Sequence, residues 1–210
     1  MTKQNLIFDI DGTLWDATHE ITKAYNEVLK RVNDTYPLIT DEMMAGIMGF
    51  LPEEIADTFF PYLSKEKRMV LLEQCFENEN KHLTKHGGTL YPDVIHVLDL
   101  LSKQYNLYIV SNCQDGYVDA LFTVHPIRDY FIDFECSGRT GLKKSDNIRL
   151  IMERNQMKQA IYIGDTQKDM IASKEAGIPF IYAAYGFGEV DSYDEIITSF
   201  KDLLSLFPCE

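Results

Sequence analysis

The chain has 210 residues, of which 45% are hydrophobic and 25% charged, as in an ordinary soluble globular protein. Its 33 acidic and 20 basic residues give a formal net charge of −13. That charge argues against nucleic acid or an anionic membrane as a partner, because both bind basic surfaces. The sequence shows no apolar leader and no run of 18 apolar residues. We therefore expect a cytoplasmic protein, monomeric or homodimeric, that acts on a small molecule.

The cysteines add a prediction about the redox compartment. They are scattered, and none has the spacing of a zinc site. The four are Cys75, Cys113, Cys136 and Cys209. Free thiols in a reducing cytosol fit this pattern.

The first predicted element is a buried strand at residues 5–10, where two carboxylates lie close together. Asp9 and Asp11 are two positions apart, so on a strand they point to the same face. Gly12 and Thr13 then break the strand, which places both acids where open α/β sheets bind ligands. An ordinary turn is the alternative interpretation. Because buried like charges repel, the pair predicts a hard metal ion, a nucleophile beside a general acid, or both.

A helical region follows instead of a second strand. Its apolar residues recur near the 3.6-residue period of an amphipathic helix. Four helices are predicted there, at residues 17–32, 41–48, 52–60 and 65–86. We interpret residues 17–86 as a helical cap domain inserted into a core domain formed by residues 1–16 and 87–210. The hinges are expected at residues 15–17 and 87–90.

The rest of the chain alternates short apolar runs with helical patterns, which is typical of βαβ units. Further strands are predicted at residues 107–111, 131–136, 160–163 and 180–183. Helices are predicted at residues 94–104, 115–123, 145–154, 168–176 and 194–206. The sequence therefore predicts an α/β fold, in which a doubly wound, Rossmann-like parallel sheet carries an inserted helical cap.

Polar groups also occur at or near the ends of the later strands. They are Ser111 and Asn112, then Lys143 and Lys144, then Asp165 and Asp169. A parallel sheet brings such positions to one edge, although each of them alone also fits a loop or a helix start. A lysine would supply positive charge for a phosphate. Asp9, Asp11 and Asp165 match the preference of Mg²⁺ for a few carboxylates with water and phosphate.

With these segments in place, the chain resembles the haloacid dehalogenase-like (HAD) hydrolase superfamily over nearly its whole length. The matching motifs are Asp9-Ile-Asp-Gly-Thr13, Ser111-Asn112, a lysine at 143 or 144, and Gly164-Asp-Thr-Gln-Lys-Asp169. The helical insert resembles the small cap of phosphoglycolate-phosphatase-like members. The resemblance implies a magnesium-dependent phosphatase of a small phosphorylated metabolite, with an aspartyl-phosphate intermediate.

The resemblance also implies roles for the acidic residues. Asp9 would be the nucleophile and a ligand of Mg²⁺. Asp11 would be the general acid/base, and its backbone carbonyl would also bind the metal. Asp165 would be the third protein ligand. Asp169 would orient a metal-bound water or the lysine rather than bind the ion itself.

The same resemblance implies the phosphate-binding residues. Ser111 and Asn112 would contact the phosphate oxygens, together with nearby backbone N–H groups. The lysine would bind phosphate and offset the charge of Asp9. We prefer Lys144 because the residues after it read as the helix start that follows the lysine in related chains, and Lys143 is the alternative.

Three other functions are weighed against the phosphatase. Sugar-phosphate mutases of this cap type usually carry Val where this chain has Thr13, and a histidine where it has Ile21. A non-catalytic binding protein that keeps the fold would be free to lose Asp9 or Asp11, and both are present. The presence of Asp11 also argues against a haloacid dehalogenase, because those enzymes lack the second acid.

The substrate is less well defined by the sequence. Phosphatases of this group often follow the first motif with Asp-Ser-x-Pro, whereas residues 16–19 read Asp-Ala-Thr-His, which weakens an assignment to phosphoglycolate. Residues 48–52 correspond to the cap segment that faces the leaving group. They offer Phe50 and no arginine.

Overall fold

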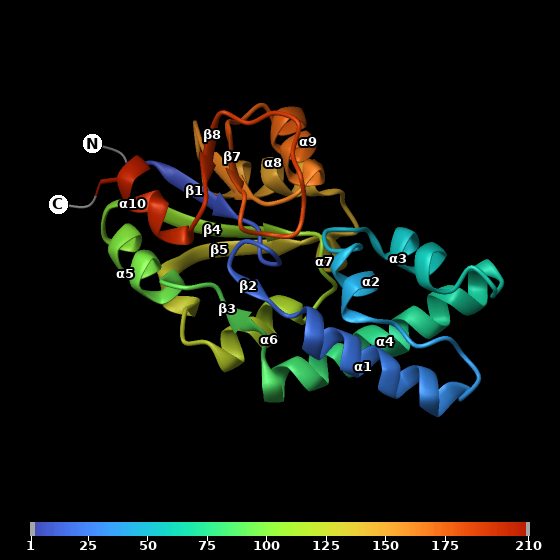
Figure 1. Ribbon diagram of the computed structural model, residues 1–210. Coiled ribbons are helices and arrows are strands. Elements are labelled where there is room, and N and C mark those ends of the chain that lie inside the picture. The colour runs from blue at the N-terminus through green and yellow to red at the C-terminus, as the bar shows by residue number, and fades with distance from the viewer. Residues whose placement is uncertain (1–2, 209–210) are drawn as a thin grey trace.

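The computed structural model describes residues 3–208, which build a six-stranded sheet between layers of helices (Figure 1). The strands are β1 (Asn5–Phe8), β4 (Asn106–Ser111), β5 (Phe131–Cys136), β6 (Ile161–Gly164), β7 (Phe180–Ala183) and β8 (Glu195–Ile197). Their spatial order is β5-β4-β1-β6-β7-β8, and all neighbours pair in parallel. The chain winds outward from β1 on one side and then on the other, so the predicted doubly wound sheet is confirmed.

The central strand β1 is buried on both faces, which explains its unbroken apolar sequence. Leu6 and Phe8 are fully buried in one hydrophobic cluster, and Ile7 is fully buried in a second cluster on the opposite face. This alternation follows from the two-residue period of a strand. The sheet therefore lies between two cores.

Helices cover both faces of the sheet. Residues of α5 (Val94–Gln104) and α10 (Leu203–Leu206) join the core that contains Phe8. Residues of α8 (Lys144–Arg154) and α9 (Gln167–Ala176) join the core that contains Ile7. Two further helices, α6 (Tyr117–Val124) and α7 (Ser137–Thr140), follow β4 and β5 along the chain.

The helix predicted at residues 194–206 is wrong. The segment forms β8, a 3-10 turn at Phe200–Asp202 and the short helix α10. Ile197 is buried and pairs with Ala183, because two consecutive β-branched isoleucines fit an edge strand. The side chains of Ser199 and Asp202 form a capping box, which starts a new helical turn after the strand.

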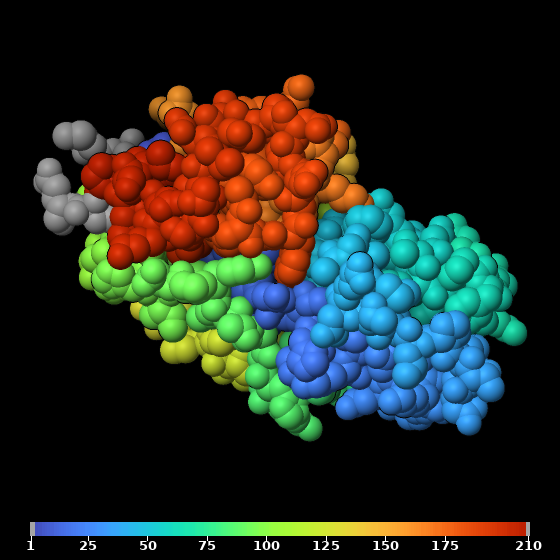
Figure 2. Space-filling model, viewed as in Figure 1, coloured from blue at the N-terminus to red at the C-terminus, as the bar shows by residue number. Residues whose placement is uncertain are grey.

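Four helices lie between β2 (Trp15–Asp16) and β3 (Thr89–Leu90), as the periodicity predicts. They are α1 (Thr18–Val32), α2 (Asp41–Ala45), α3 (Pro52–Phe59) and α4 (Lys65–His86). They lie beyond the carboxyl ends of the sheet strands (Figure 1). In Figure 2 the segment around α2 and α3 abuts the segment around α9, and an ion pair joins them, with Lys168 Nζ 2.6 Å from Glu54 Oε2.

The strands β2 and β3 form a small antiparallel sheet that the sequence analysis did not predict. Trp15 pairs with Leu90, and Asp16 pairs with Thr89, so the two ends of the helical segment are joined by backbone hydrogen bonds. The pair coincides with the expected hinges. The division into core and cap domains stays a prediction.

Two other sequence-based expectations concern membranes and thiols. Within residues 3–208, no helix combines the length and apolar character that a membrane span requires. Cys75, Cys113 and Cys136 are free thiols, and Cys209 lies outside the described residues.

Candidate active site

The acid pair lies in a tight turn directly after β1. The backbone N–H of Asp9 donates to the carbonyl of Ile163 in β6 over 2.9 Å, which continues the pairing one residue beyond the strand. The chain then turns at Gly12, whose φ is +75°. A Cβ atom at Gly12 would lie 1.9 Å from Asp165 Oδ2, so only glycine fits there. The turn therefore brings the first and fourth motifs into contact.

Lys144 links Asp9 to the fourth motif. Its Nζ lies 3.1 Å from Asp9 Oδ2 and 2.5 Å from Asp169 Oδ1, and all three side chains are buried. Asp169 Oδ2 in turn accepts hydrogen bonds from the backbone N–H and the hydroxyl of Thr166 at the start of α9. Lys143 lies outside this group, because it is half exposed and pairs with Glu175. The structure therefore brings Lys144, not Lys143, to Asp9.

A divalent cation fits the carboxylates near Lys144. Carboxylate oxygens of Asp9, Asp165 and Asp169 lie within 4.8 Å of one another. Oδ1 of Asp9 and Oδ1 of Asp165 are buried without a hydrogen-bond partner, whereas both oxygens of Asp169 are engaged. Burial raises the pKa of Asp9 and of Asp165 above the usual range. A hard cation would relieve these buried charges and orphaned oxygens, so the residues present fit Mg²⁺.

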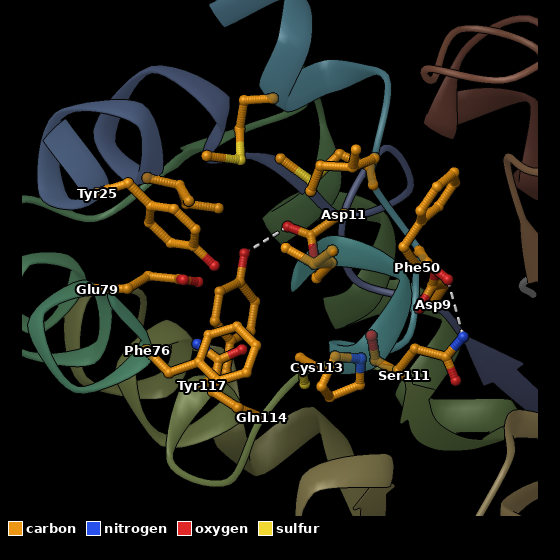
Figure 3. Close-up of a pocket in the computed structure, with 18 residues that line it drawn as sticks. Asp9, Asp11, Tyr25, Phe50, Phe76, Glu79, Ser111, Cys113, Gln114 and Tyr117 are labelled. Carbon is orange, nitrogen blue, oxygen red and sulfur yellow. Dashed lines mark hydrogen bonds between the residues drawn. The ribbon is translucent and has the colours of Figure 1, made fainter. Parts of the chain in front are cut away.

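The carboxyl of Asp11 points away from this group and into a pocket. Its Oδ1 accepts a hydrogen bond from Trp15 Nε1 over 2.9 Å. It accepts a second one from the Tyr117 hydroxyl over 2.5 Å, which Figure 3 shows. Burial raises the pKa of Asp11 to about 6, while the bonds from Tyr117 and Trp15 oppose that rise. A carboxyl that titrates near neutral pH is suited to accept and release a proton.

The second motif lies beside Asp9 at the end of β4. Ser111 and Asn112 are both buried and both line the pocket. The Asn112 amide donates to the carbonyl of Gly49 over 2.9 Å and accepts from the Ser137 hydroxyl over 3.1 Å. Its side chain is therefore engaged in joining the segment before α3 to the core. Phosphate binding by Ser111 and Asn112 stays a prediction.

The pocket also contains polar residues that the sequence analysis missed. They are Tyr25 from α1, Glu79 from α4, and Gln114 and Tyr117 from the region after β4. Glu79 is only 3% exposed. The sequence does contain a signal for its burial. Leu72, Cys75, Glu79 and Leu83 are spaced so that they lie on one face of a helix, which places an acidic residue within an otherwise apolar face.

Glu79 gives a prediction about pH and stability. Burial raises the pKa of Glu79 from 4.5 to about 8. The folded protein therefore binds this proton more tightly than the unfolded chain, so the contribution of Glu79 to stability is lost as the pH rises through this range. The Glu79→Gln variant has no such carboxyl to ionise. We therefore expect the difference in unfolding free energy between the variant and wild type to increase, in favour of the variant, by on the order of 3 kcal/mol as the pH rises from 5 to 8.5.

Urea denaturation at the two pH values measures this gain. The control is Glu77→Gln on the same helix, because the side chain of Glu77 is 74% exposed and its replacement should shift stability equally at both pH values. Parallel behaviour of the Glu79 and Glu77 variants would contradict the prediction.

Comparisons with known proteins agree with the geometry. A family model described as haloacid dehalogenase-like hydrolase matches residues 6–183. A protein named phosphoglycolate phosphatase from Vibrio vulnificus is 28% identical over 204 residues, which cover 89% of this chain and 87% of the relative. A relative of the same name from Aquifex aeolicus is 25% identical over 212 residues, covering 96% and 95%.

Solved structures agree as well. A haloacid dehalogenase-like family hydrolase from Streptococcus pneumoniae matches with a TM-score of 0.85 and 27% identity, over 98% of both chains. The motif residues, the sheet topology and these matches lead to one conclusion: the chain belongs to the haloacid dehalogenase-like hydrolases.

Proposed function

We propose that the protein is a magnesium-dependent phosphatase that hydrolyses a small phosphorylated metabolite through an aspartyl phosphate on Asp9. The observation that carries this proposal is the buried contact of Asp9 with Lys144, next to the unpartnered oxygens of Asp9 and Asp165. The family match and the relatives named phosphoglycolate phosphatase support a phosphatase. The net charge of −13 supports a small-molecule partner rather than a nucleic acid.

The reaction takes place in two displacements. A carboxylate oxygen of Asp9 attacks the phosphorus, and the alcohol leaves with a proton from Asp11. Asp11 is then ionised and accepts a proton from the water that attacks the phosphorus of the aspartyl phosphate. Phosphate is released and Asp9 is restored. The bonds from Trp15 and Tyr117 hold the Asp11 carboxyl in place for both proton transfers.

Positive charge must neutralise the phosphoryl oxygens during both steps. Lys144 supplies part of it and is held in position by Asp169. Mg²⁺, when held by Asp9, Asp165 and the backbone carbonyl of Asp11, supplies the rest of this neutralisation. Ser111 adds a hydroxyl donor from the end of β4.

The helical segment at residues 17–86 acts in this proposal as a cap that excludes water and shapes the leaving-group pocket. Side chains from α1, α2, α3 and α4 all line the pocket together with Asp9 and Asp11. The protein would work in the cytoplasm, as a monomer or a homodimer.

The proposal predicts metal-dependent hydrolysis of a generic aryl phosphate. Activity with Mg²⁺ should fall by a factor of at least about 100 in excess EDTA and return when Mg²⁺ is added back. Calcium should substitute poorly, because its larger and looser coordination shell misplaces the nucleophile. Release of p-nitrophenol measures the rate. Full activity in EDTA would contradict the metal assignment, and no hydrolysis of any phosphomonoester would contradict the phosphatase.

A further inference from the structure

The pocket beyond Asp11 has walls that limit what a substrate's leaving group can be. Apolar side chains from the helical segment line much of it: Ile21, Met44, Ile47, Met48, Ile55 and Phe76. Its free volume is about 50 Å³, far below the several hundred Å³ of sites for drug-sized ligands. The pocket is therefore suited to a small leaving group.

One part of this wall is polar. The hydroxyl of Tyr25 and the amide of Gln114 lie near the carboxyl of Glu79 and oppose the rise in its pKa. The Gln114 amide donates a hydrogen bond to Asn80 Oδ1 over 3.1 Å. Figure 3 shows Tyr25 and Glu79 pointing toward the hydroxyl of Tyr117. Because Tyr117 hydrogen-bonds Asp11, the polar part of the wall lies next to the proposed general acid.

The pocket offers no positive charge to a leaving group. Its ionisable carboxyl groups are those of Asp9, Asp11 and Glu79, and no lysine, arginine or histidine belongs to the lining among residues 3–208. Lys144 pairs with Asp9 and Asp169 and does not line this pocket. Lys168 lies over the ring of Phe50, 3.7 Å from its centroid. It is paired with Glu54, so its charge is already compensated.

Building on the proposed phosphatase, we propose that Glu79 and Tyr25 bind a neutral hydroxyl on a small alcohol leaving group, and that this pocket rejects a carboxylate there. A carboxylate on the leaving group would be buried next to acidic side chains with no cation to pair with. The free energy of burying that charge exceeds what a hydrogen bond in the pocket can offset. This chain would then differ in substrate from its relatives named phosphoglycolate phosphatase.

A hydroxyl also fits better than an ammonium group. Because burial raises the pKa of Glu79 to about 8, its carboxyl is largely protonated at neutral pH. A hydroxyl accepts a hydrogen bond from the protonated form and donates one to the ionised form. An ammonium group only donates, so it would require the ionised carboxylate.

Three two-carbon phosphate esters that differ only at the far end test this inference. They are 2-hydroxyethyl phosphate, 2-aminoethyl phosphate and 2-phosphoglycolate, with ethyl phosphate as the reference that lacks a polar end group. With Mg²⁺ at pH 7, we expect kcat/KM for 2-hydroxyethyl phosphate to exceed that for 2-phosphoglycolate by at least about 10-fold. The amino ester should fall between them. Equal or faster hydrolysis of 2-phosphoglycolate would overturn the inference.

Variants of Glu79 test whether this residue sets the preference. Glu79→Leu removes the hydrogen bonds, so kcat/KM for 2-hydroxyethyl phosphate should drop about 10-fold, to the level of ethyl phosphate. Hydrolysis of ethyl phosphate should fall by much less, so the ratio of the two kcat/KM values should drop toward 1. Glu79→Gln keeps hydrogen-bonding groups and should retain the preference. Glu77→Gln, on the exposed side of α4, is the matched control and should match wild type on all four esters.

The outcomes separate this inference from the proposed function. If the wild-type protein does not hydrolyse an aryl phosphate, the proposed phosphatase function itself is wrong. An active wild type in which Glu79→Leu lowers all four esters equally, with an unchanged melting temperature, would overturn only the role of Glu79. Selective loss on the hydroxyl ester supports the inference.

Discussion

Asp9→Asn should abolish covalent capture of phosphate, whereas Asp11→Asn should let the phosphoenzyme accumulate. The first change removes the nucleophile, and we expect turnover to fall by about 10⁴-fold or more. The second change leaves Asp9 able to attack an ester with a good leaving group but removes the base that activates water. Mass spectrometry of acid-quenched Asp11→Asn protein should find one phosphoryl group on the peptide that contains Asp9.

Hydroxylamine provides a chemical control, because it cleaves an acyl phosphate and leaves a phosphoserine intact. The label should therefore disappear from the Asp9 peptide after treatment. Label on Ser111 or on a histidine would show that the proposed mechanism is wrong, as would wild-type turnover by a folded Asp9→Asn protein.

Lys144→Met should have the next largest effect. It removes the one cation in contact with Asp9 and Asp169 among the described residues, and both carboxylates stay buried. Unpaired buried charges of this kind cost about 3–5 kcal/mol in unfolding free energy. Turnover should also fall by about 10³-fold, because the positive charge next to the nucleophile is lost. Urea denaturation and aryl phosphate hydrolysis measure the two effects.

Lys143→Met is the matched control. Lys143 lies next in sequence, but it is half exposed and pairs with Glu175 at the surface, so its loss should change stability by at most about 1 kcal/mol. A double variant, Lys144→Met with Asp169→Asn, should recover part of the lost stability because one unpaired charge is removed. If Lys143→Met inactivates the enzyme and Lys144→Met does not, the assignment is reversed.

The core of the fold was predictable because each central strand is buried on both faces. Leu6, Ile7 and Phe8 form a continuous apolar run for that reason, and the polar residues that end such runs meet at one sheet edge. That rule alone brings Asp9, Ser111 and Asp165 together. It also explains why a search for strand ends finds most of the candidate site.

The edges of the fold were harder to predict. Residues 194–206 have helical periodicity, but the pairing of Ile197 with β7 imposes a strand at one end of them. The short β2 and β3 strands have too few residues for a pattern. They form because segments more than 70 positions apart in the sequence come into contact, and the sequence around each strand does not predict that contact.

The polar residues of the pocket next to Asp11 were not predicted, for a different reason. Tyr25 and Glu79 lie on helices whose orientation toward Asp11 follows from how the helical segment packs on the core, and no strand end marks them. Asn112 illustrates the same limit, because its side chain joins the carbonyl of Gly49 from the helical segment. The hydrophobic pattern of one segment predicts its own secondary structure, but it does not predict which residues of another segment it will contact.

The pairing of β2 with β3 has a consequence for how this protein can evolve. The chain enters the helical segment after β2 (Trp15–Asp16) and leaves it at β3 (Thr89–Leu90). Because these two strands are paired, the two ends of the segment lie side by side, at the roughly 5 Å spacing of paired strands. An insert with adjacent ends can be lengthened, shortened or exchanged without rerouting the rest of the chain. If the helical segment shapes the leaving-group pocket as proposed, selection can alter which substrate is accepted while leaving the residues around Asp9 and Lys144 unchanged.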